Sequence, residues 1–403
     1  MLTGRTIKER ALELGFDLAG IAPVSIWKDL EFSRGWMEKG FNGEMHYLEN
    51  PKRFNPLLVL PSAKSVVAVG LIYNAPLPYS TEVKTGPPQP RAWISRYAWG
   101  RDYHEIMRAK LEQLRDSLEK SVPGIETRVF VDTGPVVERA LARYSGLGWM
   151  GKNTCIINQG KGSWFFLGVI LTSLELAPDL PAPDRCGSCT ACLQACPTGS
   201  LVEPYVMDAS RCISYFTIEL RGSIPQEFRP MLGNNVFGCD ICQDVCPWNH
   251  SYQQSAFSPQ QGPSMPSADE GRARQVATTK ASQFRPMLVA SRPAFSDEAS
   301  TLRRDNEPRT TGHEQRTTDL SSFSLFNPPL EALASITEED FRRIFSHSPI
   351  KRTRYRGWLR NLCVAMGNSG DERFVPWLER AAAHSDPIVR EHAVWALDRL
   401  RSE

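Results

Sequence analysis

The sequence predicts an α+β protein of 403 residues with four successive segments. Three observations support this division. Strand-like apolar runs alternate with amphipathic helical patterns up to residue 180, eight of the ten cysteines lie within 181–252, and helical patterns alone fill 323–403. Residues 253–322 are rich in Ser, Thr, Gln and Pro and contain no Trp, Tyr or Cys. We therefore expect an α/β domain at 1–180, a cysteine-rich domain, a low-complexity and mostly disordered insertion at 253–322, and a helical domain.

The first domain alternates strands with helices, as α/β folds do. The patterns predict strands at 17–22, 66–73, 127–131 and 163–176, and helices at 3–14, 33–48, 97–122 and 136–144. The run 66–73 is apolar throughout, which is typical of a strand that helices bury on both faces. A Gly-rich loop at 146–154 could bring its backbone close to a large planar or anionic ligand.

Asp132 is a candidate functional side chain in this domain. It follows the strand 127–131, in the turn before the helix 136–144. Open α/β sheets place ligand contacts at such carboxyl ends of strands. An Asp in this position can instead cap the N-terminus of the next helix, and the spacing alone favours neither role.

Eight cysteines have the spacing of iron–sulfur ligands. Residues 186–197 read C-x-x-C-x-x-C-x-x-x-C-P, and residues 239–247 repeat this pattern with one thiol fewer. This is the bacterial ferredoxin pattern, in which the fourth Cys of one half binds the cluster of the other half. Cys212, between the halves, supplies the missing thiol. The predicted ligands are Cys186, Cys189, Cys192 and Cys246 for a first [4Fe-4S] cluster, and Cys196, Cys212, Cys239 and Cys242 for a second.

Zinc and disulfide bonds are the alternative uses of these thiols. Zinc sites usually combine two C-x-x-C pairs, and three thiols at i, i+3 and i+6 followed by Cys-Pro fit that arrangement poorly. Disulfides would require export, but the N-terminus lacks the apolar core of a signal peptide and no run is long enough to span a membrane. We expect a cytoplasmic protein whose thiols bind metal. Cys155 and Cys363 are expected to be small buried hydrophobic residues.

The net charge of +2 excludes no class of partner, but the charge is unevenly distributed. Residues 341–370 contain seven Lys and Arg side chains and no Asp or Glu, with Tyr355 and Trp358 among them. A charge run can be an ordinary solvated surface, whereas cations interleaved with aromatic rings favour a polyanion-binding face. Helices are predicted at 358–366, 373–383 and 391–400, and Asp-Pro-x-Val-Arg at 386–390 resembles a HEAT-type repeat. The candidate phosphate contacts are Lys351, Arg352, Arg354, Arg356 and Arg360.

Together with the cysteine pattern, short motifs spread over nearly the whole chain resemble the epoxyqueuosine reductase family. These motifs lie at 52–56, 99–104, 131–134, 151–153, 162–167 and 211–214. The resemblance implies a cobalamin-dependent iron–sulfur oxidoreductase that converts epoxyqueuosine to queuosine at the wobble position of tRNA, the last step of queuosine biosynthesis. The insertion at 253–322 departs from the family, which normally passes directly from the Cys-Pro-Trp-Asn turn to the C-terminal helices.

The resemblance also implies roles for individual residues. Asp132 becomes the proton donor, electrons pass from the clusters to cobalamin, and the basic face binds the tRNA. The family binds cobalamin without the D-x-H-x-x-G motif, and here Met107 occupies the place of that motif's glycine. The implied cofactor contacts are Arg53, Asp132, Gly151, Thr154, Ser214 and Asp240. We also expect an unidentified electron donor and a monomer.

Two other classes of protein remain open from the sequence. One is a two-cluster ferredoxin that only carries electrons, but such a carrier has no use for 180 preceding residues or a basic helical tail. The other is a cobalamin enzyme of the reductive dehalogenase type acting on a small molecule, although those enzymes generally carry an export signal. Bound cobalt would separate the first class from a reductase, and tRNA binding would separate the second.

Overall fold

The computed structural model describes residues 2–25, 27–83, 86, 89–250, 277–291 and 321–402. The chain forms two compact units, each assembled from segments that are distant in the sequence. Unit 1 comprises 1–77, 103–210 and 241–282, and unit 2 comprises 78–102, 211–240 and 283–403. The units therefore interleave along the chain, whereas the sequence suggested domains in linear succession.

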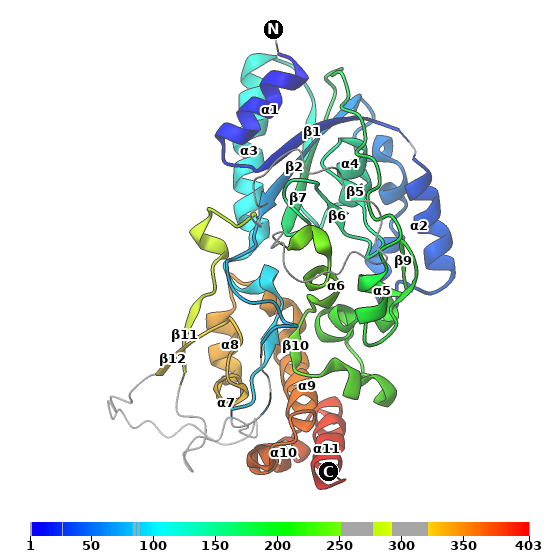
Figure 1. The fold of residues 1–403 in the computed structure, drawn as a ribbon. Coiled ribbons are helices and arrows are strands. Elements are labelled where there is room, and N and C mark those ends of the chain that lie inside the picture. Colours follow the sequence, from blue (N-terminus) through cyan, green and yellow to red (C-terminus); the bar gives the residue numbers. More distant parts are fainter. Residues whose placement is uncertain are drawn as a thin grey trace, which may run out of the picture. The chain divides into compact units, whose positions relative to one another are not determined.

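Unit 1 is built on a four-stranded sheet (Figure 1). Its strands are β1 (Leu18–Pro23), β2 (Ser65–Ile72), β4 (Thr127–Phe130) and β7 (Phe165–Thr172), and their order is β1-β2-β7-β4. The four strands lie within a few residues of their predicted positions. Every neighbouring pair is antiparallel, so the α/β arrangement expected for this domain is wrong and the α+β class describes it better.

Helices cover both faces of this sheet. On one face α3 (Tyr103–Ser121) packs so closely that a Cβ atom added to Gly168 would lie 2.7 Å from Leu111. On the other face Leu141 of α4 (Glu138–Tyr144) shares a core with Val169 and Leu171. Successive residues of a strand point to opposite faces, so both faces of the central strands need apolar side chains. This double coverage explains why β2 is apolar throughout although the sheet is antiparallel.

The other elements of unit 1 are short. The helices are α1 (Gly4–Glu13), α2 (Lys28–Glu38), α5 (Ala191–Ala195) and α6 (Ile241–Asp244); the strands are β5 (Trp149–Met150), β6 (Ile156–Ile157), β8 (Leu201–Glu203) and β9 (Val206–Met207). The predicted helix at 33–48 is wrong in extent. It ends at Glu38, because Gly40 and Gly43 adopt positive φ angles that terminate a helix.

Unit 2 contains five helices among its described residues. They are α7 (Leu330–Ala334), α8 (Glu338–Ile344), α9 (Arg354–Gly367), α10 (Val375–Ala382) and α11 (Pro387–Ser402). Every residue of α9 from Gly357 onward is buried, and α11 packs along both α9 and α10 (Figure 1). A short parallel pair joins β3 (Trp93–Ile94) to β10 (Asn235–Phe237). The helical character of the C-terminal segment is confirmed, while its assignment to HEAT-type repeats stays a prediction.

Part of the predicted disordered insertion is ordered. Most of 253–322 lies outside the described residues, but 277–291 and 321–322 lie within them. Here β11 (Leu288–Ser291) pairs with β12 (Ser321–Ser324) in antiparallel fashion. The backbone of Met287 also donates to Trp99 O at 2.9 Å, and the Arg101 N–H donates to Gln283 O at 2.8 Å. These backbone hydrogen bonds order a segment whose composition predicted disorder, so the prediction is wrong for these residues.

Among the described residues, each helix is either too short or too polar to cross a lipid bilayer.

Candidate active site and cluster-binding segments

Asp132 occupies a strained turn between β4 and α4. Its φ angle is +55°, a left-handed conformation that costs a non-glycine residue about 1 kcal/mol or more. Its backbone N–H donates to Oε1 of Glu138 at 2.5 Å. The N-cap of α4 is Val137, so Asp132 does not cap this helix. The Asp132 side chain is instead 52% exposed, and the turn presents its carboxylate to solvent.

His104 and Arg53 both contact the Asp132 turn. His104 Nε2 lies 3.3 Å from Asp132 Oδ2. The His104 ring stacks on Tyr103, with 4.1 Å between centroids, and Tyr103 stacks in turn on Phe166 at 4.2 Å. Two residues after Asp132, Gly134 O accepts a hydrogen bond from Arg53 Nη1 at 2.8 Å. The arrangement holds one exposed carboxylate beside an imidazole whose orientation is fixed by stacking.

Glu138 is a member of this site that the sequence reasoning missed. Burial, and next the Asp132 carboxylate, raise the pKa of Glu138 to about 8, against the opposing effects of the Asp132 N–H, Arg53 and His104. At neutral pH the Glu138 carboxyl is therefore mostly protonated. In the sequence, Glu138 is only a Glu six residues after Asp132. This spacing is common where a turn is followed by a helix, so it did not indicate a functional residue.

The loop from Gly151 to Cys155 is tied to both cysteine segments of unit 1. Lys152 is 9% exposed, and its Nζ donates to Gly187 O at 2.6 Å and to Cys189 O at 2.9 Å. Asn153 Nδ2 donates to Cys242 O at 3.1 Å. We predicted that this Gly-rich loop contacts a ligand. The hydrogen bonds of Lys152 and Asn153 instead connect the loop to the two cysteine segments.

Gly151 and Thr154, two of the predicted cofactor contacts, shape this loop. A Cβ atom on residue 151 would lie 2.5 Å from Ile157 Cδ1 and 2.7 Å from Asn153 Oδ1, so a larger residue would require these side chains to move. Thr154 has a φ angle of +63°, a second strained non-glycine position in unit 1. Strained backbone of this kind clusters at ligand-binding sites and active sites.

The four thiols predicted for the first cluster all belong to unit 1. Burial raises the pKa of Cys246 to about 12, and the nearby Cys186 and Cys192 add to this rise. Burial likewise raises the pKa of Cys192 to about 11, with further contributions from Cys186 and Cys189. The thiols therefore lie close enough to influence one another electrostatically, which fits a shared cluster.

The wall around these thiols is aromatic and apolar. Cys246 packs with Trp149 and Ile157, and the indole rings of Trp149 and Trp248 meet edge to face at 4.9 Å. Among the described side chains, no three of His, Cys, Asp and Glu converge on a single metal-ion position. A [4Fe-4S] cluster is a larger object held by cysteine thiolates around it, so it needs a thiol set of this kind in a sheltered pocket.

The thiols predicted for the second cluster are divided between the units. Cys196 and Cys242 belong to unit 1, and Cys212 and Cys239 belong to unit 2. All four are partly buried. Of the two remaining cysteines, Cys363 is buried as expected, whereas Cys155 is only partly buried.

Asp240 and Ser214, the last predicted cofactor contacts, belong to unit 2. Asp240 is 1% exposed, and its carboxylate accepts hydrogen bonds from Trp93 Nε1 at 2.9 Å, Ser95 Oγ at 2.5 Å and the Arg96 N–H at 2.8 Å. Burial raises the pKa of Asp240, and these donors oppose the rise. The Asp240 carboxylate therefore has a structural role. Ser214 is partly exposed at the start of a π-helical turn, Tyr215–Glu219, and does not cap it.

Basic side chains gather where α9 begins. Arg354 has a φ angle of +59° and is exposed, and no hydrogen bond or ion pair holds its side chain among the described residues. Three neighbours have acidic partners: Lys351 pairs with Asp102 at 2.9 Å, Arg352 with Glu219 at 2.6 Å and Arg356 with Asp386 at 3.7 Å. Each of these pairs leaves at least a third of the basic side chain exposed.

Arg221 is a second residue that the sequence reasoning missed. It lines a small notch together with Arg354 and Arg356. Burial, and next the charge of Arg354, lower the pKa of Arg221, and Arg352 and Arg356 add to this effect. The guanidinium groups of Arg221, Arg354 and Arg356 therefore concentrate positive charge at this notch.

Arg360 is not part of this exposed surface. It is 1% exposed, and its guanidinium donates to Leu220 O at 2.9 Å, to Gly222 O at 2.8 Å and to Phe216 O. These carbonyls belong to the π-helical turn and the residues after it, which Arg360 holds against α9. We therefore exclude Arg360 from the candidate phosphate contacts.

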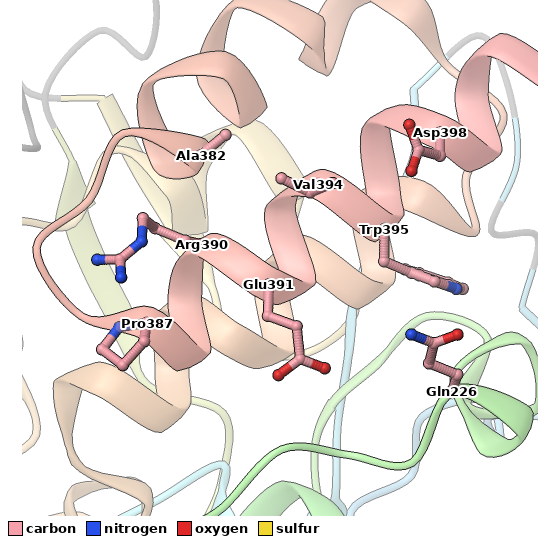
Figure 2. A pocket seen from close by; sticks show the side chains of 8 residues that line it. All are labelled: Gln226, Ala382, Pro387, Arg390, Glu391, Val394, Trp395 and Asp398. Atoms are coloured by element: carbon pink, nitrogen blue, oxygen red, sulfur yellow. The ribbon is translucent and has the colours of Figure 1, made fainter.

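A hollow of about 550 Å³ lies beside α11 (Figure 2). Figure 2 shows Trp395, Glu391 and Val394 on α11 and Gln226 opposite Trp395. None of the residues predicted for catalysis, cofactor binding or phosphate contact lines it. The hollow therefore does not belong to the candidate site.

The cysteine segment defines the class of protein. Residues 185–249 match the family described as a 4Fe-4S double cluster binding domain. The chain is thus an iron–sulfur protein with sites for two clusters. Residues 53–133 match a second family, described as Epoxyqueuosine reductase QueG, DUF1730.

Similarity to whole proteins identifies the family. The chain is 37% identical to the epoxyqueuosine reductase of Pseudomonas aeruginosa, over 98% of this chain and 94% of that protein. It is 35% identical to the epoxyqueuosine reductase of Escherichia coli, over 97% of this chain and 88% of that protein. The chain belongs to the epoxyqueuosine reductase family, and it is accordingly an oxidoreductase.

Two solved structures share the fold of this chain. A crystal structure of epoxyqueuosine reductase with an epoxyqueuosine-modified tRNA-Tyr stem loop has a TM-score of 0.75 and 30% identity, over 98% of this chain and 89% of that one. A Bacillus subtilis epoxyqueuosine reductase, solved with its catalytic loop swung out of the active site, has a TM-score of 0.73 and 28% identity, over 98% and 90%.

Proposed function

We propose that the protein reduces epoxyqueuosine to queuosine in the anticodon loop of tRNA, the last step of queuosine biosynthesis, using two [4Fe-4S] clusters and cobalamin. The observation that carries the proposal is the Asp132 turn, in which a strained backbone presents an exposed carboxylate beside His104. The relative crystallised with an epoxyqueuosine-modified stem loop supports the nature of the substrate.

The chemistry explains why the chain needs these groups. Removing the epoxide oxygen as water and leaving an alkene consumes two electrons and two protons. Amino-acid side chains do not supply such electrons, whereas iron–sulfur clusters reach potentials as low as roughly −700 mV. Cobalamin, when bound, would supply a reduced cobalt that activates the epoxide ring.

We assign the cofactor contacts to Arg53, Asp132, Gly151, Thr154 and Ser214, and we leave out the enclosed Asp240 carboxylate. Asp132 and Thr154 are two of the five described non-glycine residues with positive φ, and a third, Arg354, belongs to the proposed tRNA surface. This coincidence of strain with the assigned sites supports the assignment, because binding sites are where such strain is retained.

Asp132 is the proposed proton donor to the opening epoxide. A donor must reach the substrate, and the Asp132 carboxylate is half exposed. It must also regain a proton, for which the mostly protonated Glu138 on the same turn and His104 are suitable neighbours. The catalytic loop that is swung out in the Bacillus subtilis relative suggests that the Asp132 turn also moves during turnover.

We assign the phosphate contacts to Lys351, Arg352, Arg354, Arg356 and Arg221. These side chains surround the start of α9 and crowd positive charge there. Phosphate contacts position a nucleic acid without reading its bases, so this surface would hold the stem while the loop nucleotide is presented to the active site. Binding should weaken steeply as salt is raised.

The test is conversion of the modified nucleoside. Anaerobically reconstituted protein, supplied with cobalamin and a chemical reductant, is incubated with epoxyqueuosine-containing tRNA, and the digested RNA is analysed by mass spectrometry. Loss of one oxygen that depends on cobalamin supports the proposal. No conversion, with both clusters assembled and cobalamin bound, would refute the proposed substrate.

A further inference from the structure

Lys152 is a buried basic residue that contacts the turn carrying Cys186 and Cys189, two predicted ligands of the first cluster. Its side chain is 9% exposed, and the ammonium donates to the carbonyls of Gly187 and Cys189. Both carbonyls lie within the C-x-x-C turn that carries Cys186 and Cys189. The backbone N–H of Lys152 also donates to the Cys186 sulfur, which partly offsets the rise in thiol pKa that burial causes. Lys152 therefore contacts the turn through its side chain and its backbone.

The charge of Lys152 has no carboxylate partner among the described residues. Carbonyl oxygens accept its hydrogen bonds but carry no net charge. Burying an unpaired ammonium costs several kcal/mol unless an opposite charge lies nearby. The acidic side chain nearest in sequence to this turn, Asp184, accepts a hydrogen bond from Tyr205 instead. The Cys186 thiol, one of those that would hold the cluster as thiolates, lies close enough to be influenced by the Lys152 charge.

We propose that the Lys152 ammonium is the internal counter-charge of the first [4Fe-4S] cluster and makes that cluster easier to reduce. The inference rests on the proposed function for the assignment of Cys186, Cys189, Cys192 and Cys246 to one cluster. Reduction adds an electron to an already negative assembly, and a cation fixed in a sheltered site stabilises the reduced form more than the oxidised one. Cluster charge, hydrogen bonds to sulfur and solvent exposure are the established determinants of such potentials.

The chain provides a matched control for this charge. Lys161 is exposed, at the tip of the turn between Asn158 and Gly162. The variant Lys152→Met removes the buried charge at nearly constant length, and Lys152→Gln removes the charge but keeps an N–H donor for the carbonyls. Lys152→Arg keeps the charge. Lys161→Met removes an equal charge that solvent screens.

The experiment is a redox titration of the reconstituted protein with both clusters, followed by electron paramagnetic resonance. We expect the midpoint potential of one cluster to become more negative in Lys152→Met and Lys152→Gln, and to stay near the wild-type value in Lys152→Arg and Lys161→Met. Wild-type potentials for both clusters in the two uncharged variants would overturn the inference.

If a variant does not assemble both clusters, its iron content is measured in place of the midpoint potential. Loss of one cluster from Lys152→Met and Lys152→Gln, but not from Lys152→Arg, would still support a counter-charge. Loss from all three would overturn it, because packing rather than charge would then be essential. The titration does not use tRNA, so failure of the wild-type protein to reduce epoxyqueuosine would contradict the proposed function without changing this result.

Discussion

Replacing Glu138 by Gln should remove a pH dependence that we expect of the wild-type reaction between about pH 7 and 9. In the wild-type protein the Glu138 pKa is about 8, so the carboxyl ionises in this range. The ionised Glu138 carboxylate would then lie near the Asp132 carboxylate. The two residues are held together by the 2.5 Å hydrogen bond from the Asp132 backbone N–H to Glu138 Oε1. Arg53 and His104 offset part of the repulsion. We expect the turn to open and turnover to fall as Glu138 loses its proton.

The magnitude follows from the shift in pKa. Glu138 titrates near 4.5 in the unfolded chain and near 8 in the folded protein, so the folded state retains a proton that the unfolded chain releases. The stability that this group contributes is fully present below pH 4.5 and is lost as the pH rises toward 8. The upper limit is about 1.4 kcal/mol for each pH unit. Because the Glu138 side chain is only partly buried, we expect the stability to change by about half of this limit for each pH unit.

The assay compares turnover and thermal unfolding of the wild type, Glu138→Gln and Glu138→Ala from pH 6 to 9. Gln keeps a carbonyl that can accept the Asp132 N–H, and His104 remains beside Asp132 to return its proton. This variant should therefore retain activity at pH 7 and lose the decline above it. Ala removes the acceptor of this exposed N–H, which costs about 0.5–1.5 kcal/mol, so we expect turnover to fall by up to about tenfold at every pH. The control is Glu119→Gln on α3, where the Glu119 carboxylate accepts a hydrogen bond from Thr127 Oγ1 at 2.8 Å. Identical pH profiles for wild type and Glu138→Gln would refute the reasoning.

Three further predictions concern the tRNA surface, the core and the first cluster. Arg354→Gln and Arg356→Gln should each weaken tRNA binding in filter assays and lower the slope of log affinity against log salt by about 0.7–0.9; unchanged slopes would contradict the assigned surface. Arg360→Met should lower the free energy of unfolding by about 3 kcal/mol in denaturant titrations, because it orphans three carbonyls, whereas exposed Arg342→Met should change it by under about 0.5. Cys246→Ser should reduce bound iron from about eight to about four atoms per chain, and retention of all eight would exclude Cys246 as a ligand.

The sequence located the Asp132 turn but not its partners. A polar residue after a strand is a local signal, and spacing therefore found Asp132. Its contacts to His104 and Glu138 depend on a left-handed backbone angle and on how α3 packs beside β4, which no local pattern encodes. For the same reason, the burial that shifts the pKa of Glu138 could not be predicted from its neighbours in the chain.

The predictions were wrong where one sequence pattern is compatible with two different structures. The run at β2 is apolar because helices cover both faces of the sheet, and this coverage occurs in antiparallel as well as parallel sheets. Arg360 and Arg354 look alike in a basic stretch, yet α9 turns Arg360 inward to the carbonyls of another segment. Arg221 was missed because it lies more than 100 residues from the cations that it joins.

The cysteine spacing was the most informative part of the sequence. Ligand spacing within a turn is set by local backbone geometry, so it can be read without the fold, and the double-cluster family match supports the expectation of two clusters. Asp240 shows the opposite case. The family resemblance implied that Asp240 contacts the cofactor, and only the structure shows that Trp93, Ser95 and Arg96 enclose its carboxylate.

The central claim is that the protein reduces an epoxide on tRNA and that Asp132 donates a proton to the opening epoxide. The most direct measurement is the mass of the modified nucleoside after a single turnover by reduced, cobalamin-loaded wild type and Asp132→Asn. We predict loss of one oxygen with the wild type, and at least a hundredfold slower loss with Asp132→Asn although its clusters and cobalamin are retained. Equal rates for the two proteins would contradict the claim.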